Sequence, residues 1–236
     1  MWIIWKRMKS KLHNLNGAVF FFLLTLLVAF FSWIGSVYGG NEVQSLLSAE
    51  GIRWSLGHIV ENYVQTPALG IVLILLMGIG VGVRAGFYDA LKRLCRKERL
   101  LSRKERRALM LASVTLLLYV IVIVGAFLLP WNFLLGVTGD LFPSPFAKGA
   151  VYIISLGIGI SGMVYGSVVD AFRTLSDVVN GMSILIARKA YYFVTLFFVV
   201  QFFSSLAYSG LAEWAHIPDE VVKILFYLSC YLPLLV

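Results

Sequence analysis

The sequence has few charged residues for its length. Only 14% of its 236 residues are Asp, Glu, Lys or Arg, whereas 60% are hydrophobic and the mean hydropathy is +0.87. Soluble globular domains carry about 25% charged residues, so this composition excludes an ordinary soluble domain. It predicts an all-α integral membrane protein, with room in one transmembrane domain (residues 1–236) for five or six helices of about 20 residues each.

Cysteine, histidine and catalytic motifs are also scarce. The two cysteines, Cys95 and Cys230, fall on opposite sides of the membrane in the topology given below, so no disulfide framework is implied. The three histidines, His13, His58 and His216, lie far apart and show no metal-ligand spacing such as HExxH. Neither a GxSxG elbow nor a GxxxxGK[ST] loop occurs. We therefore expect no enzyme activity, no catalytic residue, no metal site and no cofactor.

Positive charge is concentrated in two short stretches that border apolar runs. Nine Lys or Arg residues lie within residues 92–107 against only two Glu residues, and four more lie within residues 1–16. Because stretches rich in Lys and Arg stay in the cytoplasm, we expect residues 1–16 to be a cytoplasmic N-terminus and residues 92–107 a cytoplasmic loop. Membrane orientation explains the net charge of +8 more simply than nucleic-acid binding does, so no nucleic-acid partner is expected.

Five apolar runs are long enough to cross a bilayer, because about 20 helical residues span about 30 Å. If both basic stretches are cytoplasmic, the runs cross alternately outward and inward, and 17 of the 20 Lys and Arg residues remain on the cytoplasmic side. The sequence thus predicts a multi-pass protein of the cell inner membrane, with the lipid bilayer as a partner. The expected spans are residues 18–37, 67–83, 109–129, 150–169 and 190–211.

Three other segments accompany the spans. Residues 41–65 mix apolar and charged side chains at helical spacing, which predicts an amphipathic segment that lies at the outer surface or dips partly into it. Residues 170–189 are polar enough to form a cytoplasmic connection. The final apolar run, residues 221–236, has only 16 residues. It is therefore either a short sixth span or a re-entrant segment.

The centres of the expected spans lack charged side chains. Ion-coupled carriers usually place some there, despite a cost of roughly 3 kcal/mol each. Glycines, in contrast, recur in the second span and occupy two faces of the fourth, which predicts close helix packing, with neighbours on two sides of the fourth. The remaining polar side chains of the fourth and fifth spans are interhelical hydrogen-bonding groups or substrate contacts. They are Ser155, Ser161, Tyr165, Ser167, Gln201, Ser204, Ser205, Tyr208 and Ser209.

Several separated motifs resemble one family of membrane proteins. The motifs are LLSAEGIRW at 46–54, PALG at 67–70, PSPFAKG at 143–149, MVYG at 163–166 and QFFSSLAYSGLA at 201–212. In their order, spacing and hydropathy they resemble the p-aminobenzoyl-glutamate transporters, the AbgT family, over most of residues 17–216. The resemblance implies a homodimeric carrier.

The chain also departs from the pattern of that family, whose members are more than twice as long. In the family, two helical hairpins that enter the membrane without crossing it hold most substrate and coupling residues. Here residues 92–107 join the second span directly to the later ones, and the chain ends where the second hairpin would begin. The resemblance therefore implies a shortened form. It leaves Gln201, Tyr208 and Ser209 as candidate substrate-binding positions, and the family's Trp-Ser-Asn reads Tyr-Ser-Gly at residues 208–210.

Two functions remain open at this point. One is a transporter-like protein that moves a small aromatic organic anion, which the resemblance favours. The other is a non-transporting membrane scaffold or accessory subunit that retains the dimerisation core, with a separate subunit that supplies the missing segments. The lack of charge within the spans favours this second function.

Overall fold

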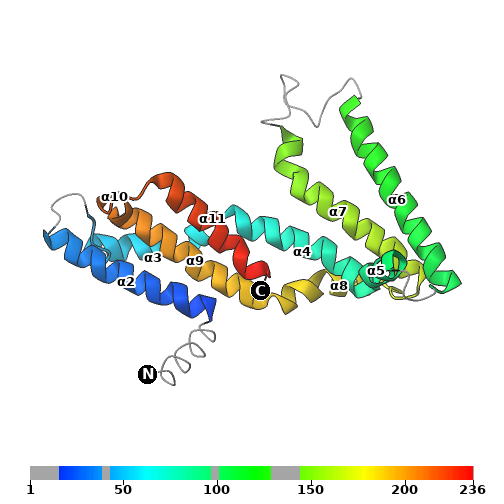
Figure 1. Ribbon diagram of the computed structural model, residues 1–236, viewed down its shortest axis with the longest axis horizontal. Helices are drawn as coiled ribbons and strands as arrows, with labels where there is room; N and C mark the ends of the chain where they lie inside the picture. The colour runs from blue at the N-terminus through cyan, green and yellow to red at the C-terminus, as the bar shows by residue number, and fades with distance from the viewer. Residues whose placement is uncertain (1–15, 39–42, 97–100, 129–143, 236) are drawn as a thin grey trace. The chain divides into compact units, whose positions relative to one another are not determined.

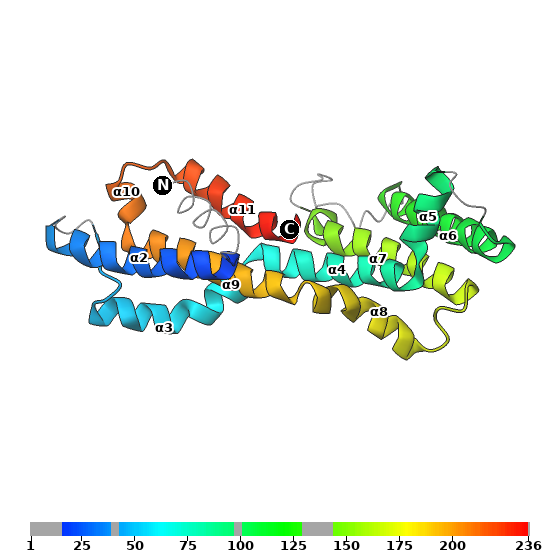
Figure 2. The same ribbon diagram turned by 60° about the horizontal axis from the view of Figure 1, so that its bottom comes forward.

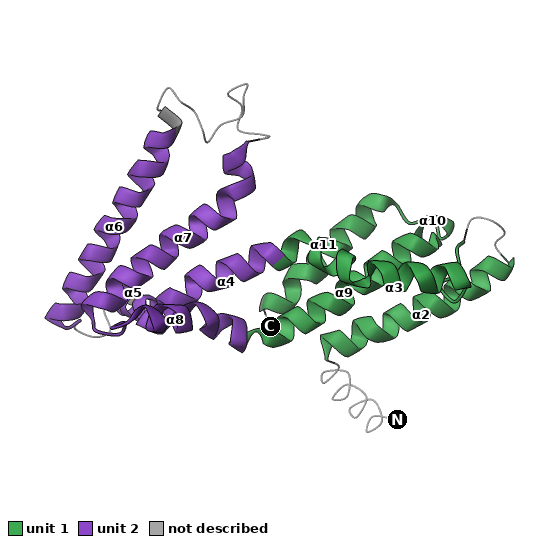
Figure 3. Ribbon diagram, turned by 180° about the vertical axis from the view of Figure 1, so that it is seen from behind, with its two compact units in different colours: residues 1–69, 189–236 green, residues 70–188 purple. Residues whose placement is uncertain are grey.

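The computed structural model describes residues 16–38, 43–96, 101–128 and 144–235. Within these ranges the chain is helical and has no strand, which confirms the all-α fold class. The chain forms two compact units, residues 1–69 with 189–236 (unit 1) and residues 70–188 (unit 2) (Figure 3). The helices of unit 1 are α2 (Gly17–Tyr38), α3 (Ala49–Val64), α9 (Ala190–Ser209), α10 (Leu211–Trp214) and α11 (Asp219–Leu235). Those of unit 2 are α4 (Pro67–Ala85, which starts in unit 1), α5 (Phe87–Arg96), α6 (Arg103–Leu128), α7 (Pro145–Val168) and α8 (Leu175–Arg188).

Unit 1 is built around α9, and α2 follows it along its length (Figure 1). At the start of both helices, the Ala18 amide donates a hydrogen bond to the Tyr191 hydroxyl at 3.4 Å. Further along both helices, the rings of Phe22 and Phe198 lie with their centroids 5.6 Å apart. Because the contacts advance in the same direction on both helices, α2 and α9 are parallel. The predicted threading requires this, since it directs the first and fifth spans the same way.

α3 lies lengthwise on α9 and runs antiparallel to it (Figure 2). Trp54 stacks on Tyr208 near the end of α9, and the Tyr63 hydroxyl donates to the Phe193 carbonyl near its beginning, at 3.0 Å. The sequence predicts a segment at the outer surface or one that dips partly into it, whereas α3 follows most of the length of a helix that can span the bilayer. The contact forms through Trp54 at one end of α3 and Tyr63 at the other, and the depth of α3 in a membrane stays a prediction.

The final apolar run forms one helix, α11, which also packs antiparallel on α9. Phe226 contacts Phe203 with ring centroids 5.3 Å apart, and at the other end the Lys189 Nζ donates to the Leu234 carbonyl at 3.1 Å. α11 therefore returns to the level at which α9 begins. α11 is not among the candidate spans of the described residues, so a short sixth span and a re-entrant segment both stay predictions.

Unit 2 contains α4, α6 and α7, with the shorter α5 and α8 beside them. Successive glycines of α4 lie against residues successively further along α7, so these two helices are parallel. α6 runs antiparallel to α7, because Tyr119 in its second half donates to the Ile153 carbonyl near the start of α7, at 2.8 Å, whereas Leu109 near its start shares a core with Tyr165. Both directions agree with the alternating threading that the cations predict.

Five helical segments in the described ranges are long and apolar enough to cross a membrane, which confirms a multi-pass membrane protein. Each overlaps one of the five expected spans. The second candidate span is longer than the expected one because it includes both α3 and α4. The segments are Gly17–Tyr38, Ala49–Ala85, Arg103–Ala126, Pro145–Val168 and Ala190–Ser209.

The described parts of the predicted loop and of the predicted cytoplasmic connection contain helices. In the expected loop at 92–107, α5 continues to Arg96 and α6 already begins at Arg103. A capping box starts α6 early, because the Glu105 amide donates to Ser102 Oγ at 3.1 Å and the Ser102 amide donates to Glu105 Oε2 at 2.9 Å. In the expected connection at 170–189, residues 175–188 form α8.

Candidate functional site

Gln201, the first predicted substrate position, lies on α9 and contacts α3. Its Nε2 donates a hydrogen bond to the Ile59 carbonyl oxygen at 2.8 Å. Hydrogen bonds between membrane helices contribute roughly 0.6 kcal/mol on average. Gln201 therefore joins two helices of unit 1, which is the interhelical alternative left open by the sequence.

Tyr208 lies two turns further along the same face of α9 and also contacts α3. Its ring stacks on Trp54 with a centroid distance of 4.2 Å, and Trp54 in turn stacks on His58 at 5.4 Å. Aromatic pairs of this kind contribute about 0.5–1.5 kcal/mol beyond their buried area. The stack places three rings side by side where α3 meets the end of α9.

Ser209 does not share the face of α9 that carries Gln201 and Tyr208. Its side chain is fully buried, and its hydroxyl donates to the Leu206 carbonyl at 3.0 Å. Its own carbonyl accepts a hydrogen bond from the Gln44 amide at 3.0 Å, which fixes the segment before α3. Gly210 follows with a φ of 67°, the left-handed conformation that ends α9. The structure thus brings Gln201 and Tyr208 to one face and places Ser209 at the helix end.

α3 also carries a charged stripe that the sequence analysis did not assign to a site. Glu50, Arg53 and Glu61 are exposed and share one helical face. Arg53 makes no ion pair with any acidic residue in the described ranges. The amphipathic pattern alone gives these charges no partner and no role. The contacts of α3 along α9 put Arg53 next to a candidate span.

The glycine faces of unit 2 produce the close approach that their spacing predicts. A Cβ on Gly162 of α7 would lie 2.9 Å from the Cα of Gly82 on α4. On another face of α7, a Cβ on Gly157 would lie 2.8 Å from the Tyr119 ring of α6. α7 therefore packs against helices on two sides, as predicted. Small residues allow this because the two backbones can come into direct contact.

A methionine-lined cavity of about 260 Å³ lies beside this glycine contact in unit 2. Met77, Met163 and Met182 come from α4, α7 and α8, and the wall also contains Ser155, whose hydroxyl donates to the Ile74 carbonyl at 2.5 Å. Methionine side chains are flexible and polarisable, so such a wall adapts to apolar and aromatic groups. Sequence reasoning missed this cavity because no local pattern joins single methionines on three helices.

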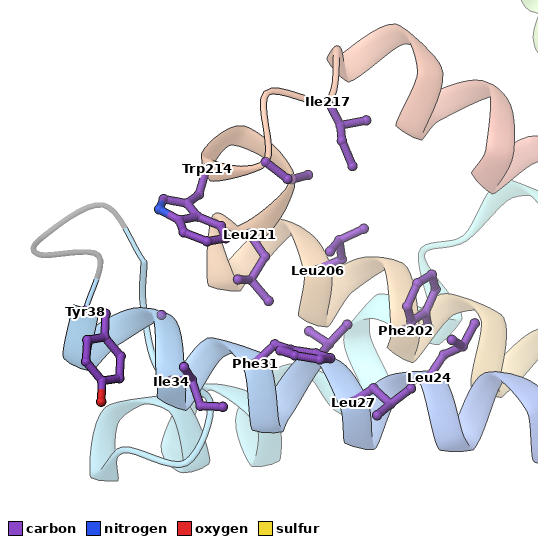
Figure 4. Close-up of a pocket in the computed structure, with 14 residues that line it drawn as sticks. Leu24, Leu27, Phe31, Ile34, Tyr38, Phe202, Leu206, Leu211, Trp214 and Ile217 are labelled. Carbon is purple, nitrogen blue, oxygen red and sulfur yellow. The ribbon is translucent and has the colours of Figure 1, made fainter.

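Unit 1 contains a larger groove of about 430 Å³ between α2, α9 and the segment that follows α9 (Figure 4). Phe31, Leu206 and Leu211 form its floor and sides, and Tyr38 and Trp214 lie at one end. None of its lining residues in the described ranges is charged. The described walls of the groove are therefore apolar and aromatic.

Ion pairs and capping groups gather where α5, α6 and the α7–α8 connection meet in unit 2. Arg93 pairs with Glu105 at 2.6 Å, and Lys104 pairs with Asp170. The hydrogen bond and charge of Lys104 lower the pKa of Asp170. Backbone amides of residues 173 and 174 donate to Asp177, which lowers the pKa of that carboxyl group as well. Asp170 thus links the α7–α8 connection to α6, and Asp177 accepts hydrogen bonds from the backbone that leads into α8.

Potential metal-ligating side chains do not cluster in the described part of the chain. No group of three or more His, Cys, Asp or Glu side chains there could hold a metal ion. Two buried polar atoms in the same part, Asn62 Nδ2 and the Tyr192 hydroxyl, have no hydrogen-bond partner. Such groups cost about 1–3 kcal/mol when unsatisfied, so they mark polar positions within unit 1 without forming a reactive constellation.

Two solved transporter structures share this fold. The YdaH transporter of Alcanivorax borkumensis is 17% identical over 84% of this chain and 72% of its own, with a TM-score of 0.70. MtrF of Neisseria gonorrhoeae, whose structure illuminates a class of antimetabolite efflux pumps, is 16% identical over 85% of this chain and 71% of its own, with a TM-score of 0.76. At these identities the likeness concerns the fold alone. No curated protein matches the chain.

The model of the AbgT putative transporter family matches two segments, residues 16–99 and 92–224. Together they cover most of the chain. The two matched segments overlap at residues 92–99. These residues belong to the basic stretch, at which the resemblance to the family implies that the first hairpin is missing. Because the family model matches well over half of this chain, the chain belongs to the AbgT putative transporter family.

Proposed function

We propose that this protein is a membrane transporter of a small aromatic organic anion of the p-aminobenzoyl-glutamate type. The observation that carries the proposal is the family match over residues 16–224. The fold that the chain shares with two transporter structures supports it. The candidate spans supply the membrane location that a transporter needs.

The chemistry of α3 suits such a substrate. An organic anion needs a cation for its carboxylate, and the guanidinium of Arg53 can bind a carboxylate through two parallel hydrogen bonds. The neighbouring stack of Trp54, His58 and Tyr208 offers an aromatic environment for an aromatic ring. In this proposal α3 provides recognition, and Gln201 holds α3 against α9.

Uptake by proteoliposomes tests the proposal. We expect the purified protein to accumulate labelled p-aminobenzoyl-glutamate above protein-free vesicles, with competition by unlabelled substrate. Losing one charge-assisted hydrogen bond costs about 1.5–3 kcal/mol, so Arg53→Gln should lower apparent affinity by roughly 10- to 100-fold. Lys223→Gln, which removes another exposed cation of unit 1, should leave uptake unchanged. Background uptake by a protein that retains its helical circular dichroism contradicts transport.

The second candidate, a non-transporting scaffold or accessory subunit, rests on how α9 is used. Gln201 and Tyr208 both contact α3, so these two predicted substrate positions hold helices together. Under this alternative, uptake appears only when a second subunit is reconstituted with the chain. Full uptake by the chain alone excludes an accessory role.

We further propose placement in the cell inner membrane with a cytoplasmic N-terminus, and assembly as a homodimer. The cation distribution supports the orientation, since 17 of 20 Lys and Arg residues fall on one predicted side. A separate subunit that supplies the hairpin segments belongs to the scaffold alternative. Light scattering in detergent measures the assembly directly, and a mass of one 26.3 kDa chain would contradict the dimer.

A further inference from the structure

The first turn of α6 in unit 2 carries more positive charge than the described residues neutralise. Glu105 pairs with Arg93, and Asp170 pairs with Lys104, so these two carboxylates are already engaged by other cations. Arg103, Arg106 and Arg107 are exposed, and none of them makes an ion pair with an acidic residue in the described ranges. We name these three residues the arginine surface.

The arginine surface continues directly into an exposed apolar stripe of α6. Residues three and four apart in a helix share a face, so the three arginines align with the side chains one, two and three turns further on. Met110, Val114 and Leu117 on this face are 64%, 48% and 60% exposed. The opposite face packs into unit 2 through Ala108 and Ala112, which are fully buried. The helix therefore has one face for the protein and one for the membrane.

α5 adds a second amphipathic element next to this surface. It contacts α6, and its fully buried Ala90 packs into the unit 2 core. Leu91 and Leu94 are nevertheless 41% and 52% exposed, and Lys92 between them is exposed as well. A short helix that exposes leucines beside a cation is typical of the boundary between headgroups and acyl chains.

From this arrangement we infer that the arginine surface binds the phosphate groups of anionic phospholipids, with an acyl chain lying along the apolar stripe. The end of an apolar stripe marks the boundary of the hydrocarbon core of the bilayer. Long cationic side chains at this boundary reach the lipid headgroups. Guanidinium groups match phosphate oxygens through paired donors. Each basic residue close to an anionic membrane contributes about fivefold in affinity.

This inference goes beyond membrane orientation and does not depend on transport. Orientation requires only that cations occur in the stretch, on any face of either helix. A lipid site requires that the unpaired cations and the exposed apolar stripe share one face, and the geometry of α6 satisfies that requirement. The ligand is a phospholipid, because a free phosphate ion would make no use of the stripe.

Lipid titration in detergent tests the site. Purified protein is mixed with dioleoyl phosphatidylglycerol or with dioleoyl phosphatidylcholine, and bound lipids are counted by native mass spectrometry while the thermal midpoint is followed. Phosphatidylglycerol should bind and raise the midpoint, and phosphatidylcholine should do neither to the same extent. Arg103→Gln with Arg106→Gln should weaken phosphatidylglycerol binding on the order of thirtyfold, which corresponds to two basic residues. Lys148→Gln with Lys223→Gln removes two exposed cations elsewhere and should change nothing.

Two further samples identify what is bound. Arg103→Lys with Arg106→Lys keeps the charge and should retain most binding, which also supplies a folded comparison if the glutamine variant unfolds. Glycerol 3-phosphate at matched concentration should not raise the midpoint, because it has no acyl chain. Equal phosphatidylglycerol binding by the glutamine variant, an equal response to glycerol 3-phosphate, or no preference for phosphatidylglycerol in the unmodified protein would each overturn the inference.

Discussion

The contact between α4 and α7 gives the sharpest stability prediction. In Gly162→Ala the new Cβ would lie 2.9 Å from both the Cα and the amide nitrogen of Gly82, and backbone atoms cannot rotate away. Overpacking a tight contact costs about 1–3 kcal/mol. Alanine gains about 0.8–1.0 kcal/mol over glycine in a helix interior, which offsets part of that cost. We expect Gly162→Ala to lower the free energy of unfolding by up to about 2 kcal/mol.

Gly149→Ala on the same helix is the matched control, because a Cβ there meets no atom within 4 Å. Both variants share the gain in helix propensity, so the difference between them isolates the steric cost. A chain of this size shifts by roughly 2–4 °C per kcal/mol, so the two thermal midpoints should differ by about 5 °C in detergent. Thermal unfolding followed by circular dichroism measures both. Equal midpoints for the two alanine variants would refute the close approach of α4 and α7.

Variants at three other positions test single contacts. Gln201→Leu removes the hydrogen bond to the Ile59 carbonyl and should cost about 0.6 kcal/mol of stability; a loss of uptake with unchanged unfolding would instead identify Gln201 as a substrate contact. Tyr208→Phe should keep the stack on Trp54, whereas Tyr208→Ala should lower the thermal midpoint, and a similar loss in both variants would contradict a stacking role. Asp177 has a lowered pKa in the folded protein, so its contribution is complete above the ordinary Asp value of 3.8 and is lost as pH falls below it. Asp177→Asn should therefore flatten part of the acid-side fall in the thermal midpoint, and an unchanged pH profile would exclude the capping role.

Much of the architecture could be predicted from local composition. Hydrocarbon-length apolar runs and the positions of Lys and Arg predict five spans and their alternating directions, and the parallel pairs α2–α9 and α4–α7 agree with that order. The glycine faces of α7 predicted contacts on two sides, which Tyr119 and Gly82 provide. These features depend on one segment at a time, so a single sequence contains them.

Features that need two segments were predicted less well. The amphipathic pattern of α3 predicted a segment at the outer surface or one that dips partly into it, but it did not show that Trp54 and Tyr63 pack along α9. Residues 92–107 look like a loop by charge alone, whereas the capping box of Ser102 and Glu105 starts α6 early. A cluster of Lys and Arg predicts on which side of the membrane a segment lies, but it does not predict whether the backbone of that segment is helical.

The candidate substrate positions show the same limit. The resemblance selected Gln201, Tyr208 and Ser209 by motif, and two of them contact α3 while the third closes the end of α9. Arg53 was outside the selected set, because its relation to α9 appears only once α3 is placed. Its role in substrate recognition stays a prediction.

The threading of the chain is the central claim, and the native cysteines allow a direct measurement. Cys95 is exposed on the basic helix α5, and Cys230 is buried. In a Cys230→Ser variant, a membrane-impermeant maleimide should label Cys95 in inside-out vesicles and not in intact cells, while a Cys95→Ser, Lys148→Cys variant in the same background should show the reverse. Labelling of Cys95 from outside intact cells would contradict the cytoplasmic position of the basic stretch and the topology derived from it.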